Sequence, residues 1–248
     1  MPIVTEKEGP ENYSNRLNKL ESIKSYSQLF YDSFITEPHT SYNLSQLLEF
    51  LPKNRSKRAL CVGYCFLKES TLLREGYFRS IETWDIDSDL VPVANNAISK
   101  LNINSKLRRL NILKDEINKD KYDTLLLFQM DYIFSDEELA LIIKKAIDAN
   151  IKECIVITPS LLHLSFPLPK EKNIFFHDLI IFMQLYIKKF RKKNTNYSDK
   201  KVMSYKVYTR FKNSFIKLFR QNGYKLRALK VSMNNNGSFH FMHFHSKK

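Results

Sequence analysis

The chain alternates between two patterns of apolar and polar residues. Short apolar runs are typical of strands buried on both faces, and they alternate with stretches in which apolar residues recur at helical spacing. The runs predict strands at residues 59–62, 81–86, 107–112, 122–129 and 153–158. The periodic stretches predict helices at residues 69–74, 90–100 and 136–149. This alternation predicts an α/β fold, in which a parallel sheet is covered by helices on both faces.

The C-terminal part of the chain has a different pattern. Residues 209–221 have helical spacing, and Gly223 is a natural C-cap for that helix. Two strand-like stretches, 225–231 and 239–245, flank an Asn-Asn-Asn-Gly sequence at 234–237, which is typical of a tight turn. We therefore expect a helix and then a β-hairpin that adds an antiparallel strand to the sheet.

The segment from residue 59 to residue 86 points to a nucleotide-type cofactor. The first predicted strand stops at Gly63, a polar loop and a helix follow, and the second strand ends at Asp85, about twenty residues further on. In a parallel sheet, this layout places a turn against the cofactor and a carboxylate against a ribose.

This order of elements resembles the class I S-adenosylmethionine-dependent methyltransferases. The resemblance covers about residues 40–160 and 205–248 and implies a Rossmann-like, seven-stranded sheet of the methyltransferase type, with S-adenosylmethionine as the cofactor. The first strand of that family usually ends in an acidic residue followed by x-Gly-x-Gly-x-Gly. Here only Gly63 is kept, because Cys61 replaces the acid and Cys65 and Leu67 stand at the later glycines.

The resemblance also implies roles for residues at the strand ends. Asp85 would accept hydrogen bonds from the ribose, although Asp85 or Asp87 could instead cap the next helix. Ile86 would pack on the adenine, and Asn111 would touch the adenine amino group or simply form a turn. The resulting cofactor-binding residues are Gly63, Tyr64, Cys65, Asp85, Ile86, Asn111 and Gln129.

Two residues are candidates for a general base, which an acceptor hydroxyl would need as it attacks the methyl group. Asp131 follows the fourth strand, where this family usually places its chemistry, and His163 follows the fifth. A structural role remains an alternative for both. The string Gln-Met-Asp-Tyr at 129–132 differs from the Asn-Pro-Pro-Tyr type of amino-methylating enzymes, which argues against adenine or cytosine amino groups as acceptors.

A metal site is not expected from the C-terminal histidines. On a strand, His243 and His245 would share one face while His240 lies on the other, so the three rings could not converge. No cysteine or acid lies close by along the chain.

The positive charge of the chain is concentrated in one segment. The formal net charge is +14, and residues 161–230 contain 17 Lys and Arg but only 3 Asp and Glu. Such a field attracts an anionic partner. Residues 161–208 could form a lid over the active site, lie on an acidic membrane surface, or bind RNA. In the RNA alternative, basic residues would continue the positive face and aromatic residues would stack on bases: Arg210, Lys212, Lys217 and Arg220, with Phe211, Phe215 and Tyr224.

These patterns divide the chain into five parts. They are a disordered tail (1–12), a helical N-terminal cap (13–56) with helical stretches at 17–34 and 44–51, a Rossmann-like cofactor-binding core (57–160), a basic, aromatic lid insert (161–208), and a last helix with a hairpin (209–248). Three cysteines without paired spacing favour a reducing cytosol. Neither a signal peptide nor a membrane span is indicated, which predicts a cytoplasmic protein that could also be peripheral at a membrane.

The sequence therefore predicts an S-adenosylmethionine-dependent methyltransferase that acts on an anionic or membrane-associated small molecule or glycan. An RNA methyltransferase is the alternative enzyme. A binding module that has lost catalysis is the alternative outside the enzymes, because the glycine turn is degenerate. The oligomeric state stays open.

Overall fold

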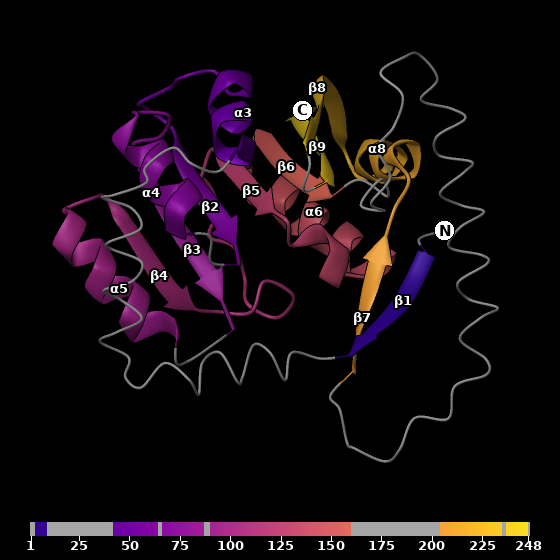
Figure 1. The fold of residues 1–248 in the computed structure, drawn as a ribbon, viewed down its shortest axis with the longest axis horizontal. Coiled ribbons are helices and arrows are strands. Elements are labelled where there is room, and N and C mark those ends of the chain that lie inside the picture. The colour runs from indigo at the N-terminus through magenta and orange to yellow at the C-terminus, as the bar shows by residue number, and fades with distance from the viewer. Residues whose placement is uncertain are drawn as a thin grey trace.

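A seven-stranded sheet forms the centre of the protein in a computed structural model that describes residues 3–8, 42–63, 66–86, 90–159, 204–234 and 237–247 (Figure 1). Its strands are β2 (Arg58–Val62), β3 (Ser80–Asp85), β4 (Ser105–Arg109), β5 (Thr124–Phe128), β6 (Glu153–Pro159), β8 (Tyr224–Asn234) and β9 (Gly237–Ser246). They lie in the order β4-β3-β2-β5-β6-β9-β8. Neighbours from β4 to β6 are parallel, and β9 is antiparallel to both β6 and β8. The predicted α/β sheet with an antiparallel C-terminal hairpin is confirmed.

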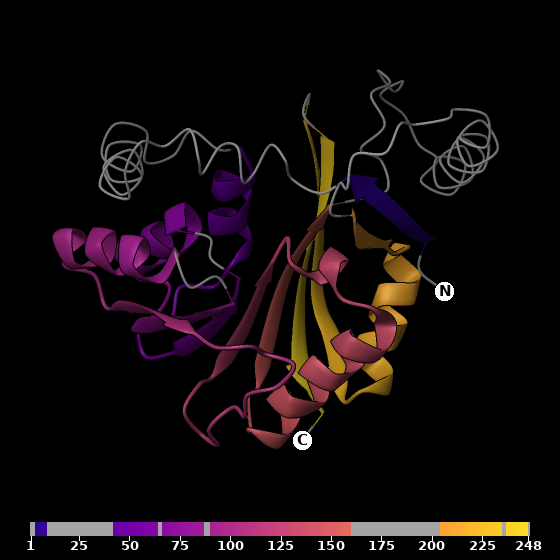
Figure 2. The same ribbon diagram turned by 90° about the horizontal axis from the view of Figure 1, so that it is seen from below.

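Helices cover both faces of this sheet. They are α3 (Tyr42–Phe50), α4 (Phe66–Arg74), α5 (Leu90–Leu101), α6 (Asp136–Asp148) and α8 (Lys212–Gln221), with the short 3-10 turn η1 (Asp131–Ile133) before α6. Figure 2 shows the sheet between α3, α4 and α5 on one side and α6 and α8 on the other. None of the helices in the described part of the chain is both long and apolar enough to cross a membrane.

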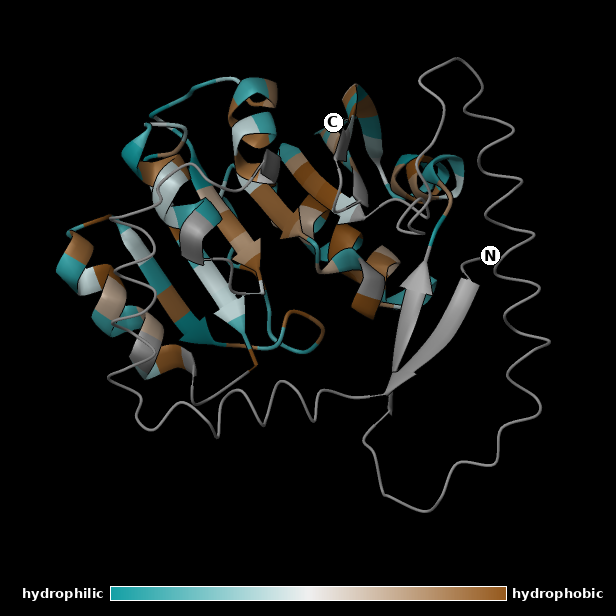
Figure 3. Ribbon diagram, in the orientation of Figure 1, coloured by the Kyte–Doolittle hydropathy of each residue, from teal (hydrophilic) through white to brown (hydrophobic). Residues whose placement is uncertain are grey.

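The central strands explain why both faces are covered. Every residue of β5 is buried, and its side chains alternate between two apolar clusters. Leu125 and Leu127 pack with α6 and α8, whereas Leu126 and Phe128 pack with α3 and α4. Figure 3 shows the same contrast, because β5 and β6 are strongly hydrophobic while the edge strand β4 is largely polar. Strands of this composition are stable only between two layers of helices.

Helix α6 has a strong start signal that fixes the chain beyond β5. Ser135 is its N-cap, and the Ser135 hydroxyl accepts a hydrogen bond from the backbone N–H of Glu138. The Glu138 carboxylate accepts one from the backbone N–H of Ser135 in return. This capping box leaves room only for the single turn η1 between β5 and α6.

Residues 3–8 differ from the expected disordered tail. They form strand β1 (Ile3–Glu8), which pairs antiparallel with β7 (Ser204–Thr209) in a second, two-stranded sheet. The β-branched residues Ile3, Val4 and Thr5 favour a strand once a partner is available. That partner lies about 200 residues away in the sequence, so no local pattern could reveal it.

Three other ends of strands and helices also differ from the prediction. Strand β4 ends at Arg109 rather than at residue 112, because the chain turns at Asn111. Residues 204–208, expected within the insert, belong to β7. Helix α8 consequently begins at Lys212 rather than at residue 209. The helical stretch at 17–34 and the insert from 161 to 203 lie outside the described residues.

Leu126→Ala should lower the free energy of unfolding by about 2–5 kcal/mol, because it leaves a cavity in the middle of the sheet. Chemical denaturation measures this loss. Leu141→Ala is the matched control, since Leu141 lies exposed on α6 and its loss should cost less than about 0.5 kcal/mol. Equal losses for the two variants would contradict the burial of β5 between two helical layers.

Candidate functional site

The carboxyl ends of the parallel strands meet at one edge of the sheet. The chain leaves β2 towards β3 on one side, while β5 lies on the other side of β2. In open α/β sheets, ligands bind at such a change of direction, beyond the carboxyl ends of the strands. The sequence-predicted residues Gly63, Asp85, Ile86, Gln129 and Asp131 all lie at this carboxyl edge.

Gly63 follows β2 in a conformation that suits glycine. Its φ is +74°, and its N–H donates a hydrogen bond of 2.9 Å to the carbonyl oxygen of Trp84 in β3. A Cβ atom at this position would lie 2.5 Å from Sδ of Met130, which follows β5. The missing side chain at Gly63 therefore makes room for the side chain of Met130, which joins the ends of β2 and β5. Tyr64 and Cys65 lie outside the described residues.

Cys61 makes a hydrogen bond to the same turn. It is buried in β2, and its thiol lies 3.5 Å from the carbonyl oxygen of Gly63, to which it donates a hydrogen bond. The residue that replaces the usual acid thus contacts the turn itself. We assign it a structural contact within the turn.

Asp85 and Ile86 lie side by side at the end of β3. Asp85 is partly buried, and its carbonyl oxygen accepts a hydrogen bond from Leu110 as the chain leaves β4. Ile86 is 69% exposed, which is unusual for a large apolar side chain next to a carboxylate. An acid beside an exposed apolar surface suits a sugar hydroxyl pair attached to a flat base. Asp87, the competing helix cap, lies outside the described residues.

Asn111 forms a turn after β4. Its side-chain oxygen accepts a hydrogen bond of 2.9 Å from the N–H of Leu113, and its carbonyl oxygen accepts bonds from Lys114 and Asp115. The structure thus supports the turn-forming alternative for Asn111, and its side-chain oxygen is committed within the turn.

Gln129 reverses the chain at the end of β5. Its φ is +59°, and its N–H donates a hydrogen bond of 2.7 Å to the carbonyl oxygen of Ile157. A left-handed conformation costs a residue with a side chain about 1–2 kcal/mol. That reversal places Met130 against Gly63 and leads Asp131 into η1.

Asp131 has a buried carboxylate, of which only one oxygen has a hydrogen-bond partner among the described residues. Its Oδ2 accepts a hydrogen bond of 2.7 Å from the hydroxyl of Thr158 in β6. Its Oδ1 is buried and has no hydrogen-bond partner among the described residues. Burial raises the pKa of Asp131 to about 6, although Thr158 and Arg210 counteract part of that rise. A carboxylate with a raised pKa and an unused oxygen can accept a proton near neutral pH. The other candidate base, His163, lies outside the described residues.

Arg210 holds the backbone of the η1 turn that carries Asp131, a role that the sequence did not reveal. It donates hydrogen bonds to the carbonyl oxygens of Asp131 (2.9 Å) and Phe134 (2.5 Å), and an ion pair of 2.7 Å joins it to Asp136. Its side chain is buried, so it does not extend a positive surface as expected. Phe215 and Tyr224 are likewise buried in the core and cannot stack on bases.

His240 lies near the same carboxyl edge. It is directly opposite Thr158 in the pairing of β6 with β9, and it points to the face covered by α6 and α8. Burial, and then the charge of Lys212, lowers the pKa of His240 to about 4. This ring is therefore neutral at pH 7.

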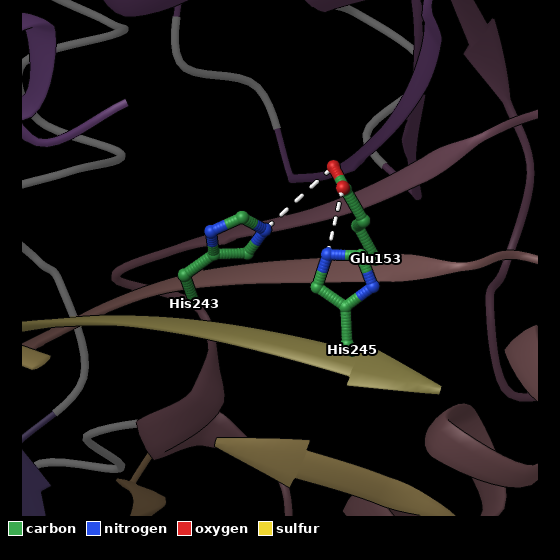
Figure 4. A group of neighbouring side chains, drawn as sticks. All are labelled: Glu153, His243 and His245. Carbon is green, nitrogen blue, oxygen red and sulfur yellow. Dashed lines mark ion pairs between the residues drawn. The ribbon is translucent and has the colours of Figure 1, made fainter. Parts of the chain in front are cut away.

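The other two histidines lie at the opposite, amino-terminal edge of the sheet (Figure 4). His243 and His245 share one face of β9 as expected, and although no acid lies near them along the chain, Glu153 lies beside them in space. Glu153 of β6 pairs with His245, and all three side chains converge. The sequence did not reveal this contact, because Glu153 precedes His243 by 90 residues and His245 by 92, and only the antiparallel pairing of β6 with β9 brings them together.

Solved structures share this fold over most of the chain, whereas no protein-family model and no curated protein sequence matches it. Magnesium protoporphyrin IX methyltransferase from Synechocystis, with SAH bound, has a TM-score of 0.57 at 13% identity, covering 96% of this chain and 95% of that chain. A SAM-dependent methyltransferase from Methanosarcina mazei has a TM-score of 0.58 at 13% identity over 81% and 96% of the two chains.

The chain has the class I methyltransferase fold. A tRNA methyltransferase from Bacillus subtilis has it too, with a TM-score of 0.53 at 12% identity, covering 86% of this chain and 68% of that chain. The predicted resemblance in the order of elements is therefore confirmed at the level of fold. Gly63, Asp85 and Gln129 lie at the carboxyl ends of β2, β3 and β5, the edge at which open α/β sheets bind ligands.

Asp131→Asn should change how stability depends on pH. The pKa of Asp131 is higher in the folded protein than its usual value of 3.8, so ionisation opposes folding. Wild-type stability should fall by up to about 3 kcal/mol as the pH rises from about 4 to about 6, and this loss should be absent in the variant. Denaturation curves across this pH range measure the difference between the two proteins.

Asp148→Asn is the control, because Asp148 is exposed at the end of α6. It should keep the wild-type slope. A slope shared by all three proteins would show that Asp131 does not carry the ionisation.

Proposed function

We propose that the protein transfers a methyl group from S-adenosylmethionine to an anionic small molecule or glycan, including one held at a membrane surface. One observation carries this proposal. Within the class I methyltransferase fold, a glycine turn at Gly63, a carboxylate at Asp85 and an apolar surface at Ile86 lie together at the carboxyl ends of adjacent strands β2 and β3, as such a cofactor needs.

The cofactor would supply the methyl group and the positive charge of its sulfonium. In our proposal, the backbone at Gly63 faces its amino-acid end, the Asp85 carboxylate accepts hydrogen bonds from the ribose hydroxyls, and Ile86 packs on the adenine. A hydrogen bond from a hydroxyl to a charged carboxylate is stronger than one between two neutral groups, so the two ribose hydroxyls would bind firmly to Asp85. Met130, which lies against Gly63, would bound this site from the side of β5.

Asp131 would act as the general base. An acceptor hydroxyl becomes a better nucleophile as it loses its proton, and the Oδ1 of Asp131, which has no hydrogen-bond partner among the described residues, can receive that proton. The acceptor oxygen would take the methyl group as its bond to the sulfonium sulfur breaks, and S-adenosylhomocysteine would leave as a neutral thioether. Thr158 on Oδ2 and Arg210 on the Asp131 carbonyl keep the carboxylate oriented. Its pKa of about 6 leaves most of the group ionised, and so ready to accept a proton, at pH 7.

The charge of the neighbouring elements supports an anionic acceptor. Residues 204–234 contain eight Lys and Arg and no Asp or Glu, and their strand β7 lies beside η1 and Asp131. Of these eight, Arg210 is neutralised by Asp136 and Arg227 lies at the opposite edge of the sheet, so the others provide the positive charge. Three of the residues expected to contact RNA are buried: Arg210, Phe215 and Tyr224. We therefore favour a small anion or glycan over RNA as the acceptor.

Asp85→Ala should weaken the binding of S-adenosylmethionine about tenfold to a hundredfold, because it removes charge-assisted hydrogen bonds to the ribose. Isothermal titration calorimetry of the whole chain measures the affinity. Ile86→Ala should weaken it several-fold through lost apolar contact. Asp148→Ala is the control carboxylate and should bind as the wild type does. Absence of binding by the wild-type protein at millimolar cofactor would refute the enzyme and leave a binding module without catalysis.

Asp131→Asn should slow methyl transfer about 10²- to 10⁴-fold while leaving the affinity for S-adenosylmethionine unchanged. The assay follows a radioactive methyl group from the cofactor into separate pools of anionic metabolites, glycans, acidic lipids and RNA. Label in the first three pools supports the proposal, and label in RNA alone would replace it with an RNA methyltransferase. An unchanged rate in the variant would exclude Asp131 as the base.

A further inference from the structure

We propose that Glu153, His243 and His245 bind a divalent transition metal ion such as Zn²⁺ at the amino-terminal edge of the sheet. This site lies at the edge opposite the proposed cofactor site, and it does not depend on methyl transfer. Two imidazoles and one carboxylate form a ligand set that Zn²⁺ commonly uses when a fourth position is left to water.

The pairing of β6 with β9 builds this site. Glu153 is the first residue of β6 and lies opposite His245, while Ile155 lies opposite His243. Because side chains alternate along a strand, His243 and His245 point to the same face as Glu153. Figure 4 shows both imidazole rings turned towards the carboxylate.

The distances suit one small ion. One ligand atom from each of the three side chains lies within 4.8 Å of the other two. His245 Nε2 is 3.0 Å from Glu153 Oε1, the carboxylate oxygen that can bind the ion, and His243 Nε2 is 3.6 Å from the second oxygen of the same carboxylate, Oε2. Adjacent ligands of a tetrahedral ion with bonds of about 2.0–2.2 Å lie about 3.3–3.6 Å apart. Small side-chain shifts would therefore complete the coordination.

Burial adds a second, independent observation. The side chains of His243 and Glu153 are only 3% and 7% exposed, and His243 Nε2 has no hydrogen-bond partner among the described residues. Its nearest acceptor, Glu153 Oε2, lies 3.6 Å away, beyond hydrogen-bond distance, and a metal bond would satisfy this buried nitrogen. The His245 side chain is 39% exposed, so an ion and a water ligand have access from that side.

Two cations now occupy the surroundings of the carboxylate and would compete with the ion. Lys57 Nζ lies 2.5 Å from Glu153 Oε2, and a guanidinium nitrogen of Arg227 lies 2.8 Å from His245 Nε2. Glu153 Oε1 can serve as the ligand while Lys57 keeps Oε2, which is the way in which a coordinating carboxylate is normally held by an outer partner. Arg227 is mostly exposed and can turn into solvent.

This competition gives the proposal a distinctive test. Removal of the Arg227 charge by Arg227→Met should strengthen zinc binding about tenfold, because a positive charge close to the ion opposes its binding. A group of side chains that merely forms ion pairs would bind no zinc with or without Arg227.

The experiment titrates Zn²⁺ into the whole chain after removal of bound metal with a chelator, and follows heat and Tm. We expect saturation at one high-affinity equivalent and a higher Tm, because the ion binds the folded state. Glu153→Gln and His245→Ala should each weaken this binding at least about tenfold. His240→Ala is the control, since His240 lies on the opposite face of β9. Co²⁺ in place of Zn²⁺ should give the absorption of a tetrahedral site.

Two results would overturn the proposal. One is the absence of saturable binding by the wild type at about 100 μM Zn²⁺, a concentration well above the Kd of ordinary protein zinc sites. The other is equal affinity in the wild type and in His245→Ala, which would place the zinc on other histidines such as His39, His163 or His177. If Glu153→Gln fails to fold, His245→Ala still decides the question, because His245 is partly exposed and its loss leaves the core intact.

Discussion

Burial of β5 and β6 on both faces is the constraint on which the rest of the structure depends. Their side chains are apolar on each face, so a layer of helices must cover each face of the sheet. Polar groups in the middle of these strands would be buried away from water and from any ligand. Chemistry is therefore confined to the ends of the strands. Asp85 and Asp131 lie at the carboxyl edge, while Glu153 and its two histidine neighbours lie at the amino edge.

The sequence revealed those parts of the fold and site that depend on neighbours along the chain. Apolar runs and helical spacing predicted every strand of the main sheet, and the glycine after β2 and the acid after β3 marked the carboxyl edge in advance. These features follow from local burial and from the length of one strand, loop and helix unit. Ile86 was also placed correctly at that edge, where it is exposed and can contact a ligand through its apolar side chain.

The parts that the sequence did not reveal all depend on contacts between distant segments. Arg210 looks like one of many basic residues until β7 brings it under η1, where three hydrogen-bonding partners surround it. Glu153 looks like an ordinary strand-starting acid until β9 returns beside it. Charge counts and periodicity treat these residues as surface groups, because neither measure contains the pairing of strands. The same limit applies to β1, whose partner lies near the other end of the chain.

The pairing of β1 with β7 also sets an order in which the protein can be completed. A chain made from its N-terminus cannot pair residues 3–8 until residues 204–209 have been synthesised. Arg210, which holds Asp131, follows β7 directly. The same last part of the chain supplies α8 and β9, whose apolar side chains complete both clusters around β5 and β6. The burial of the central strands and the enclosure of the Asp131 carboxylate therefore both wait for the C-terminal residues.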